Sequence, residues 1–209
     1  EVVTSGDVPE MRVWNPDGSM AENCGNGIRM VSRYLDLAGR LPGHGRVLTG
    51  AGEVRVRVDG AVVAVDMGRA VFPAGEAVEE LSTDAGSVAL AEVSMGNPHA
   101  VIRHDDPDAV VATIGPLVET SSRFPERTNV EFIRTDGPGE ITMRVWERGA
   151  GETLASGSSS TAVAAAAVVQ GWCDSPVTVH LGGGDLVVAI EKDADGVLRA
   201  TQTGEAQEI

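Results

Sequence analysis

An internal duplication constrains the fold of this chain more than any other feature of its sequence. The tetrapeptide MRVW occurs at Met11–Trp14 and again at Met143–Trp146, 132 positions later. The matches continue in the same register without a gap: Cys24-Gly25 with Ser156-Gly157, Val31 with Val163, Gly39 with Gly171, Val47 with Val179, Gly50 and Gly52 with Gly182 and Gly184, and Val56 with Val188. Because one offset accounts for the full set, we expect two copies of one structural unit.

Each copy has the pattern of a strand, a turn-rich segment, a helix and a hairpin. The alternation in EMRVW predicts a strand, and the apolar spacing predicts helices over residues 27–39 and 159–171. Each helix pattern stops at a glycine, Gly39 or Gly171, where a left-handed cap is expected. In the first copy Asp59-Gly60 predicts the hairpin turn. We therefore predict an α+β fold of two pseudo-symmetric domains, each a mixed sheet wrapped around a central helix.

The repeat also predicts the domain organisation. We expect an N-terminal half over residues 1–75, joined by the tail 200–209, and a C-terminal half over residues 76–199. The second half carries MGNPHAVI (95–102) and FPERTNVEF (124–132) before its MRVW, and the first-half counterparts of these segments would precede residue 1. The first half is therefore expected to lack about 50 residues of a longer protein.

Composition excludes several classes of protein. A formal net charge of −15 argues against nucleic-acid binding, since phosphate backbones would be repelled, and no apolar run approaches the ~20 residues that span a bilayer. Two cysteines argue against a disulfide framework and favour a cytoplasmic location. The scattered histidines predict no metal site. Lys192, the one lysine, lies in an expected surface turn, which argues against a pyridoxal-phosphate enzyme.

The two helix starts are the candidate functional elements. Cys24 precedes GNGIR and Ser156 precedes GSSST, so each lies beside unpaired N–H groups that attract anions and favour a thiolate. Two copies related by a pseudo-twofold axis would direct both helix starts into one cleft. A small anionic substrate would then have one reactive side chain on each face, as inversion of a stereocentre without a cofactor requires.

Four ordered motifs identify a family. NPDGSMAENCGNGIR, SMGNPHAVI, FPERTNVEF and ERGAGETLASGSSSTA closely resemble the diaminopimelate epimerase family over nearly the whole chain. The resemblance implies a cofactor-independent amino-acid epimerase, two similar α+β domains, a two-cysteine mechanism and a homodimer. Its implied substrate is LL-diaminopimelate, which is converted to the meso form for lysine and peptidoglycan synthesis.

The resemblance also implies roles for individual residues. Cys24 would donate a proton on one face of the substrate, and Ser156 occupies the position of the second cysteine, which abstracts the proton on the other face. Four residues would hold the α-carboxylate at the helix starts: Gly25, Asn26, Gly157 and Ser158. The two amino-acid ends of the substrate would be bound by Asn15, Asn97, Asn129, Glu147 and Arg148. His99 and Glu147 would support the thiols or orient the substrate.

The chain departs from the family pattern at one helix start. The family reads Cys-Gly-Thr-Gly where this chain has Ser156-Gly157-Ser158-Ser159, and a serine hydroxyl is a far weaker acid than a thiol. Three interpretations stay open: an engineered substitution, a natural member with weak or one-sided activity, or a relative with another reaction. The expected missing segment would also carry a Gly-Asn-Asp-Phe-like motif that contributes to substrate binding in the family.

Alternatives without catalysis exist for each candidate. Cys24 could be a small buried hydrophobe, Ser156 a helix N-cap, and Asn15 the start of a turn. Glu147 and Arg148 could form a surface ion pair, and His99 could be structural. The runner-up functions are a one-base isomerase or dehydratase of the proline racemase-like superfamily and a catalytically silent amino-acid binder.

Overall fold

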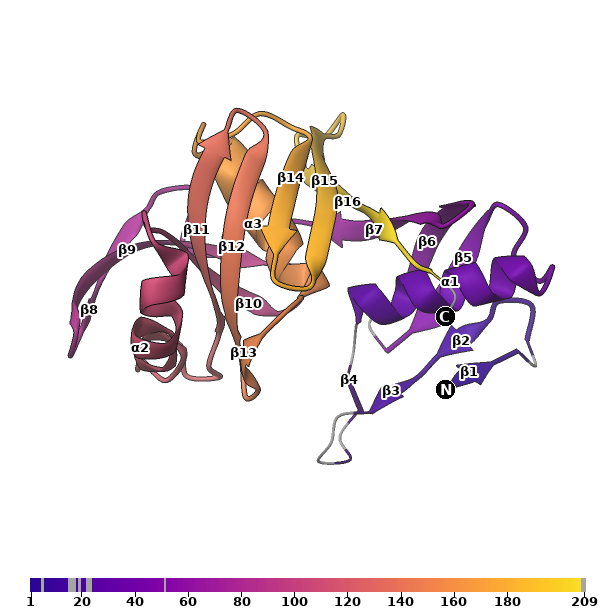
Figure 1. Ribbon diagram of the computed structural model, residues 1–209, viewed down its shortest axis with the longest axis horizontal. Helices are drawn as coiled ribbons and strands as arrows, with labels where there is room; N and C mark the ends of the chain where they lie inside the picture. The colour runs from indigo at the N-terminus through magenta and orange to yellow at the C-terminus, as the bar shows by residue number, and fades with distance from the viewer. Residues whose placement is uncertain (5, 15–17, 19, 22–23, 51, 208–209) are drawn as a thin grey trace. The chain divides into compact units, whose positions relative to one another are not determined.

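The chain folds into two compact units, made of residues 1–68 with 201–209 and of residues 69–200 (Figure 1). The computed structural model describes every residue except 5, 15–17, 19, 22–23, 51 and 208–209. One strand, β16 (Leu198–Glu205), begins in the second unit and ends in the first. The chain therefore enters the first unit twice, at its beginning and at its end.

The first unit packs one helix against a mixed sheet. Helix α1 (Gly25–Leu37) buries Ile28 and Leu35 completely against the sheet core, which includes Val47 and Val63. The sheet has the strand order β1 (Val2–Val3), β2 (Glu10–Met11), β5 (His44–Thr49), β6 (Gly52–Asp59) and β7 (Val62–Arg69). A separate two-stranded ribbon joins β3 (Val13–Trp14) and β4 (Met20–Ala21).

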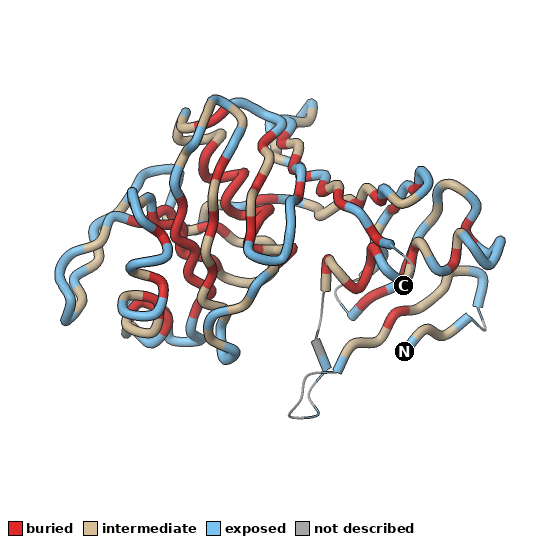
Figure 2. Tube along the Cα trace, in the orientation of Figure 1, coloured by how far each residue is buried: buried red, intermediate tan, exposed pale blue. Residues whose placement is uncertain are grey.

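The second unit surrounds its central helix with sheet. Helix α3 (Gly157–Val169) is buried along nearly its whole length, including every residue from Ala162 to Ala167, as the red tube in Figure 2 shows. The strand order is β16, β15 (Gly184–Lys192), β14 (Val177–Leu181), β12 (Glu140–Glu147), β11 (Asn129–Gly137), β10 (Pro98–Arg103), β9 (Gly86–Ser94) and β8 (Glu79–Thr83). The pairs β10–β11 and β12–β14 are parallel. Strand β13 (Gly151–Thr153) pairs with β12, and α2 (Pro107–Glu119) packs on β11 and β12.

The predicted α+β class is confirmed, and the elements repeat at the offset found in the sequence. Helices α1 and α3 are both 13 residues long, and their bounds differ by 132 positions. Gly39 and Gly171 follow the two helices with the same positive φ of 67°. Val47 and Val179 are both fully buried at equivalent positions. The duplication is therefore consistent with the fold.

Two local expectations differ from the structure. The predicted strand EMRVW is one continuous strand in the second copy, β12, but is divided into β2 and β3 in the first. Its two parts pair with different partners, since β2 lies beside β1 and β5, whereas β3 pairs with β4. Both helices also begin two residues earlier than predicted, because their first-turn glycines adopt helical geometry.

Candidate functional site

Cys24 lies at the N-cap of α1 with its thiol turned toward the helix start. Its backbone is extended (φ −150°, ψ 94°), and its Sγ accepts a hydrogen bond from the Gly27 N–H at 3.4 Å. A Cβ atom at Gly27 would lie 3.2 Å from this sulfur. The glycine at position 27 therefore permits the close approach of the thiol to the backbone. Cys24 is half-buried and also packs against the apolar core of the first unit, as the alternative of a small hydrophobe predicts.

Ser156 occupies the equivalent N-cap position of α3. Its backbone is also extended (φ −141°, ψ 120°), and its carbonyl oxygen accepts hydrogen bonds from the N–H and the hydroxyl of Ser160. Its own side chain, however, accepts no capping hydrogen bond, although the residue is only 5% exposed. Ser156 is therefore the N-cap residue of α3 by position, as that alternative predicted, but its side chain makes no capping hydrogen bond. Its small buried hydroxyl occupies the place where the first copy presents a thiol.

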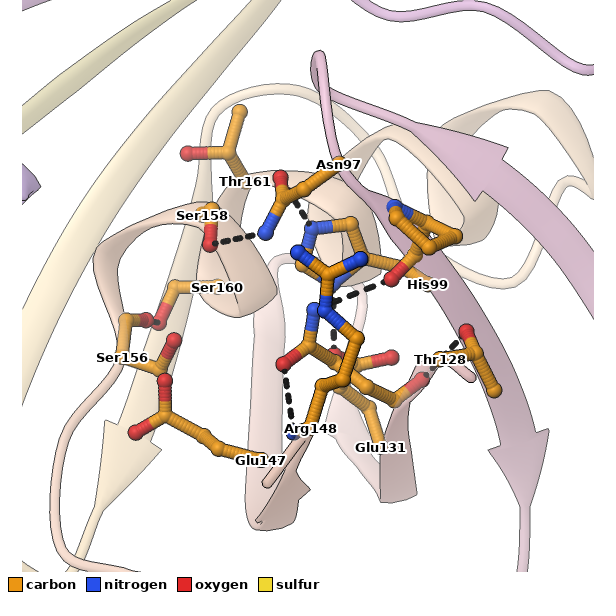
Figure 3. Close-up of polar contacts among 12 residues, drawn as sticks. Asn97, His99, Thr128, Glu131, Glu147, Arg148, Ser156, Ser158, Ser160 and Thr161 are labelled. Carbon is orange, nitrogen blue, oxygen red and sulfur yellow. Dashed lines mark hydrogen bonds and ion pairs between the residues drawn. The ribbon is translucent and has the colours of Figure 1, made fainter. Parts of the chain in front are cut away.

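A polar cluster of the second unit connects strands β10 and β11 with the start of α3 (Figure 3). The Nδ1 of His99 lies 2.7 Å from Glu131 Oε1, and both side chains are fully buried. The Nε2 of His99 lies 3.0 Å from Asn97 Oδ1, and Asn97 Nδ2 donates to Ser158 Oγ at 3.4 Å. The contacts form an unbroken chain from Glu131 to the first turn of α3. His99 thereby fixes the orientation of the Asn97 amide.

Asn129 joins two of the segments that carry predicted site residues. Its Nδ2 donates to the carbonyl oxygen of Pro98, and its Oδ1 accepts from the Arg148 N–H, both at 2.9 Å. The residue is only 5% exposed, and both contacts are partly buried. Asn129 therefore holds the GNPH segment and the turn after β12 in a fixed relation.

Glu147 and Arg148 follow one another at the end of β12 but do not pair. Glu147 Oε1 accepts a hydrogen bond from the Thr153 hydroxyl, and Figure 3 shows the Glu147 side chain extending toward Ser156. No ion pair of Arg148 occurs among the described residues. The alternative of a surface ion pair between these two residues is therefore wrong. The Arg148 residue is exposed.

The structure assembles the predicted residues in two groups. Cys24, Gly25 and Asn26 lie at the start of α1 in the first unit. The second group belongs to the second unit and contains Asn97, His99, Asn129, Glu147, Arg148, Ser156, Gly157 and Ser158. Asn15 lies outside the described residues. Within the described part of the chain, no group of three His, Cys, Asp or Glu side chains could hold a metal ion, and no helix is long and apolar enough to cross a membrane.

The sequence interpretation missed two functional candidates, Glu131 and Arg29. Glu131 is an acid between Val130 and Phe132 in a strand whose residues are all buried at this point. Arg29 lies on the buried face of α1, next to Ile28. A charged residue at a core position needs a partner, and this pattern is the signal that could have identified both.

Comparison with known proteins identifies the family. The model of the family described as diaminopimelate epimerase matches residues 2–73 and 91–209. The chain is 43% identical to diaminopimelate epimerase of Alkalilimnicola ehrlichii, over 94% of this chain and 75% of the relative. It is 47% identical to the enzyme of that name from Pelotomaculum thermopropionicum, over 88% of this chain and 71% of the relative.

Solved structures show the same fold at low sequence identity. A probable proline racemase from Agrobacterium radiobacter K84 superposes with a TM-score of 0.76 at 16% identity, covering 100% of this chain and 74% of the other. A hydroxyproline epimerase from Agrobacterium vitis gives a TM-score of 0.74 at 14% identity, covering 98% and 70%. The family model matches most of this chain, and both relatives are more than 40% identical to it. This chain therefore belongs to the diaminopimelate epimerase family of isomerases.

Proposed function

We propose that this chain interconverts LL- and meso-diaminopimelate by proton transfer at the α-carbon, without a cofactor. The observation that carries the proposal is the half-buried Cys24 thiol at the start of α1, in contact with a backbone N–H. The first N–H groups of a helix carry partial positive charge that attracts a carboxylate, and the α-carboxylate of the substrate is the group expected there. Gly25, Asn26, Gly157 and Ser158 are proposed to bind it.

The proposed binding of the amino-acid ends uses the polar cluster of the second unit. The Arg148 guanidinium, which has no ion-pair partner among the described residues, is suited to a carboxylate. Glu147 is suited to an ammonium group. Asn97, whose amide is fixed by His99, and Asn129 are proposed to orient these ends. A homodimer stays a prediction of the family resemblance, and a cytoplasmic location stays a prediction from the two cysteines.

Proton transfer follows from the acidity of the two side chains. In the family reaction the residue at position 156 removes the α-proton as the C–H bond breaks, and the Cys24 S–H delivers a proton to the opposite face of the carbanion. A serine hydroxyl is very weakly ionised near neutral pH, whereas a thiol with an ordinary pKa of about 8.5 is partly ionised. Abstraction at Ser156 is therefore the slow step in this chain.

Proton exchange in D₂O tests the proposal directly. Cys24 in its thiolate form can remove an α-proton from one stereoisomer and return a deuteron to the same face, without help from Ser156. We expect deuterium to enter the α-position of that isomer faster than the other isomer appears. Equal exchange into both isomers would show two working faces and contradict the assignment of Ser156. Tight binding with no exchange into either isomer would support the silent amino-acid binder instead.

Restoring the thiol tests position 156. Ser156→Cys is expected to raise the epimerisation rate by at least about 100-fold, the range attributed to a positioned general base. Ser159→Cys is the matched control, because Ser159 is buried in the same helix turn and its hydroxyl has no hydrogen-bond partner among the described residues. The proposal assigns the removal of the α-proton to position 156. A Ser156→Cys variant that binds substrate without gaining activity would refute it.

The runner-up function is a one-base isomerase of the same fold. The observation that favours it is the serine at position 156, because of the two N-cap residues Cys24 alone has a thiol. Such an enzyme would use Cys24 alone and would move the proton within one face of the substrate. Its signature is deuterium exchange at the α-carbon of a single isomer. In that case the Ser156→Cys variant gains no epimerisation activity.

A further inference from the structure

We propose that Arg29 is a positioning residue, which fixes the side-chain amide of Asn26 as a hydrogen-bond donor for a carboxylate at the start of α1. The inference rests on the proposed function, because a substrate carboxylate is the group expected there, but its test needs no substrate. It begins from a structural feature of α1, an arginine on the buried face of the helix.

Two amide oxygens hold the Arg29 guanidinium. Its Nη1 donates to Gln202 Oε1 at 2.6 Å, and its Nη2 donates to Asn26 Oδ1 at 2.8 Å. Arg29 is only 7% exposed and Gln202 is fully buried, so Gln202 anchors the guanidinium inside the first unit. Because the guanidinium is planar, contacts at both terminal nitrogens restrict its rotation.

The contact with Arg29 settles which end of the Asn26 amide faces the arginine. A guanidinium has N–H donors and no acceptor, so the amide oxygen must face it and the amide nitrogen must point away from it. Asn26 is half-buried, and its Nδ2 has no hydrogen-bond partner in the described part of the chain. Since Asn26 is the second residue of α1, an oriented N–H donor is presented at the helix start.

The charge of Arg29 points to the kind of ligand. Although the sequence has 31 acidic residues, no ion pair of Arg29 occurs among the described residues, and its buried Nε has no hydrogen-bond partner among them. The contact with Asn26 brings this cation to the first turn of α1, which is the positive end of the helix dipole. Positive charge gathered in this way is costly without an anion, so the helix start is suited to a carboxylate.

The second helix start has a similar arrangement made from different residues. At the 132-residue offset Ser158 is equivalent to Asn26, and its Oγ accepts a hydrogen bond from Asn97 Nδ2 at 3.4 Å. The oxygen of the Asn97 amide lies 3.0 Å from Nε2 of the buried His99. In both units, therefore, a buried basic side chain contacts the oxygen of an asparagine amide, and the amide nitrogen is the end presented at a helix start.

The test compares the rate at which iodoacetate alkylates Cys24 with the rate for iodoacetamide, by mass spectrometry. Both reagents react with the same thiolate, but only iodoacetate carries a carboxylate, so the ratio of the rates reports carboxylate recognition and not thiol ionisation. Cys24 caps α1 two residues before Asn26, and all variants carry Cys173→Ser so that Cys24 is the one thiol present. We expect the ratio to be about 10-fold higher in the folded parent than in the urea-unfolded chain.

The variants separate positioning from charge alone. Arg29→Gln is expected to remove the preference for iodoacetate, because the Asn26 amide is then no longer held, whereas Arg29→Lys keeps a charged donor and should retain most of it. Asn26→Ala is also expected to remove the preference, and adding Arg29→Gln to Asn26→Ala should have no further effect, since Arg29 acts through Asn26. Arg33→Gln removes a charge from the same helix, is the matched control and should leave the ratio unchanged.

Three results would overturn the proposal: a folded parent without the preference, a folded Arg29→Gln chain that keeps it, or an equal loss in Arg33→Gln. Additive losses in the double variant would show that the guanidinium acts on the carboxylate directly, and would overturn it too. If Arg29→Gln does not fold, a preference retained in Asn26→Ala overturns it in the same assay. The outcome is independent of turnover: a preference that depends on Arg29, without α-proton exchange, would retain this role and remove the proposed epimerase function.

Discussion

The indole Nε1 of Trp146 donates a hydrogen bond to Glu119 Oε2 at 2.7 Å, and so joins the end of α2 to β12. The other oxygen of Glu119 accepts from the Gly149 N–H at 2.9 Å and from Arg127 at 3.4 Å. Glu119 is nearly buried, and burial acts to raise its pKa, but the hydrogen bonds from Trp146 and Gly149 and the charge of Arg127 lower it overall. This carboxylate therefore holds the turn that carries Arg148.

Glu119→Gln is expected to lower the free energy of unfolding and to make this free energy depend less on pH in the acidic range. Because the pKa of Glu119 is lowered in the folded chain, the folded state binds fewer protons than the unfolded state. The stabilisation is complete above the ordinary glutamate value of about 4.5 and is lost as pH falls through the lowered pKa. At pH 7 the free energy of unfolding of the variant should be about 1–3 kcal/mol lower than that of the parent. On acidification it should fall less than that of the parent.

Urea unfolding at pH 7 and at pH 4 measures both effects. Glu152→Gln, at an exposed position of β13, is the control and is expected to change stability by less than about 0.5 kcal/mol. A Glu119→Gln variant that is as stable as the parent at pH 7 would contradict the role assigned to this carboxylate.

Asn129→Ala is expected to destabilise the second unit by about 2 kcal/mol. The substitution leaves the Pro98 carbonyl and the Arg148 N–H without their buried partner, and unsatisfied polar groups are costly. Urea unfolding, monitored by tryptophan fluorescence, measures the free energy of unfolding. Thr113→Ala removes a hydroxyl from the exposed face of α2 and should have little effect; equal losses in the two variants would argue against a joining role for Asn129.

Removal of the Ser156 hydroxyl should cost almost no helix stability. Ser156→Ala is expected to change the free energy of unfolding by less than about 0.5 kcal/mol, because its side chain makes no capping hydrogen bond. Asp106→Ala is the comparison, since Asp106 caps α2 by accepting from the Ala109 N–H at 3.2 Å, and should cost about 1 kcal/mol. Thermal unfolding of both variants measures the two losses of stability. A loss at position 156 as large as that at position 106 would show that the Ser156 side chain caps the helix.

Gly39→Ala and Gly171→Ala are each expected to cost about 1 kcal/mol. Both glycines have a φ of 67°, which a side chain with a Cβ adopts only at a cost. An added Cβ would meet no atom within 4 Å at either position, so the loss measures backbone strain alone. Gly137→Ala, where φ is not positive and the nearest atoms lie 4.0 Å away, is the control in urea unfolding. Unequal costs at Gly39 and Gly171 would indicate that the two copies have diverged in backbone preference.

Local pattern predicts much of this fold, and long-range pairing accounts for what it misses. The repeat register placed both helices within two residues of their observed starts, because caps and apolar spacing are local properties. Glu131 could not be assigned to His99 from the sequence, since their contact depends on the parallel pairing of β10 with β11, which sets His99 opposite Asn129. The partner of Arg29 is even further away, because Gln202 follows it by 173 residues.

That last contact has a consequence for biosynthesis. Residues 201–209 belong to the first unit, where Gln202 binds Arg29 and Ala206 enters the core beside α1. A ribosome releases the N-terminal segment of α1 long before it releases the tail that completes its surroundings. The surroundings of Arg29 are therefore completed late, and a nascent or C-terminally clipped chain would carry this buried guanidinium without the Gln202 amide that binds it.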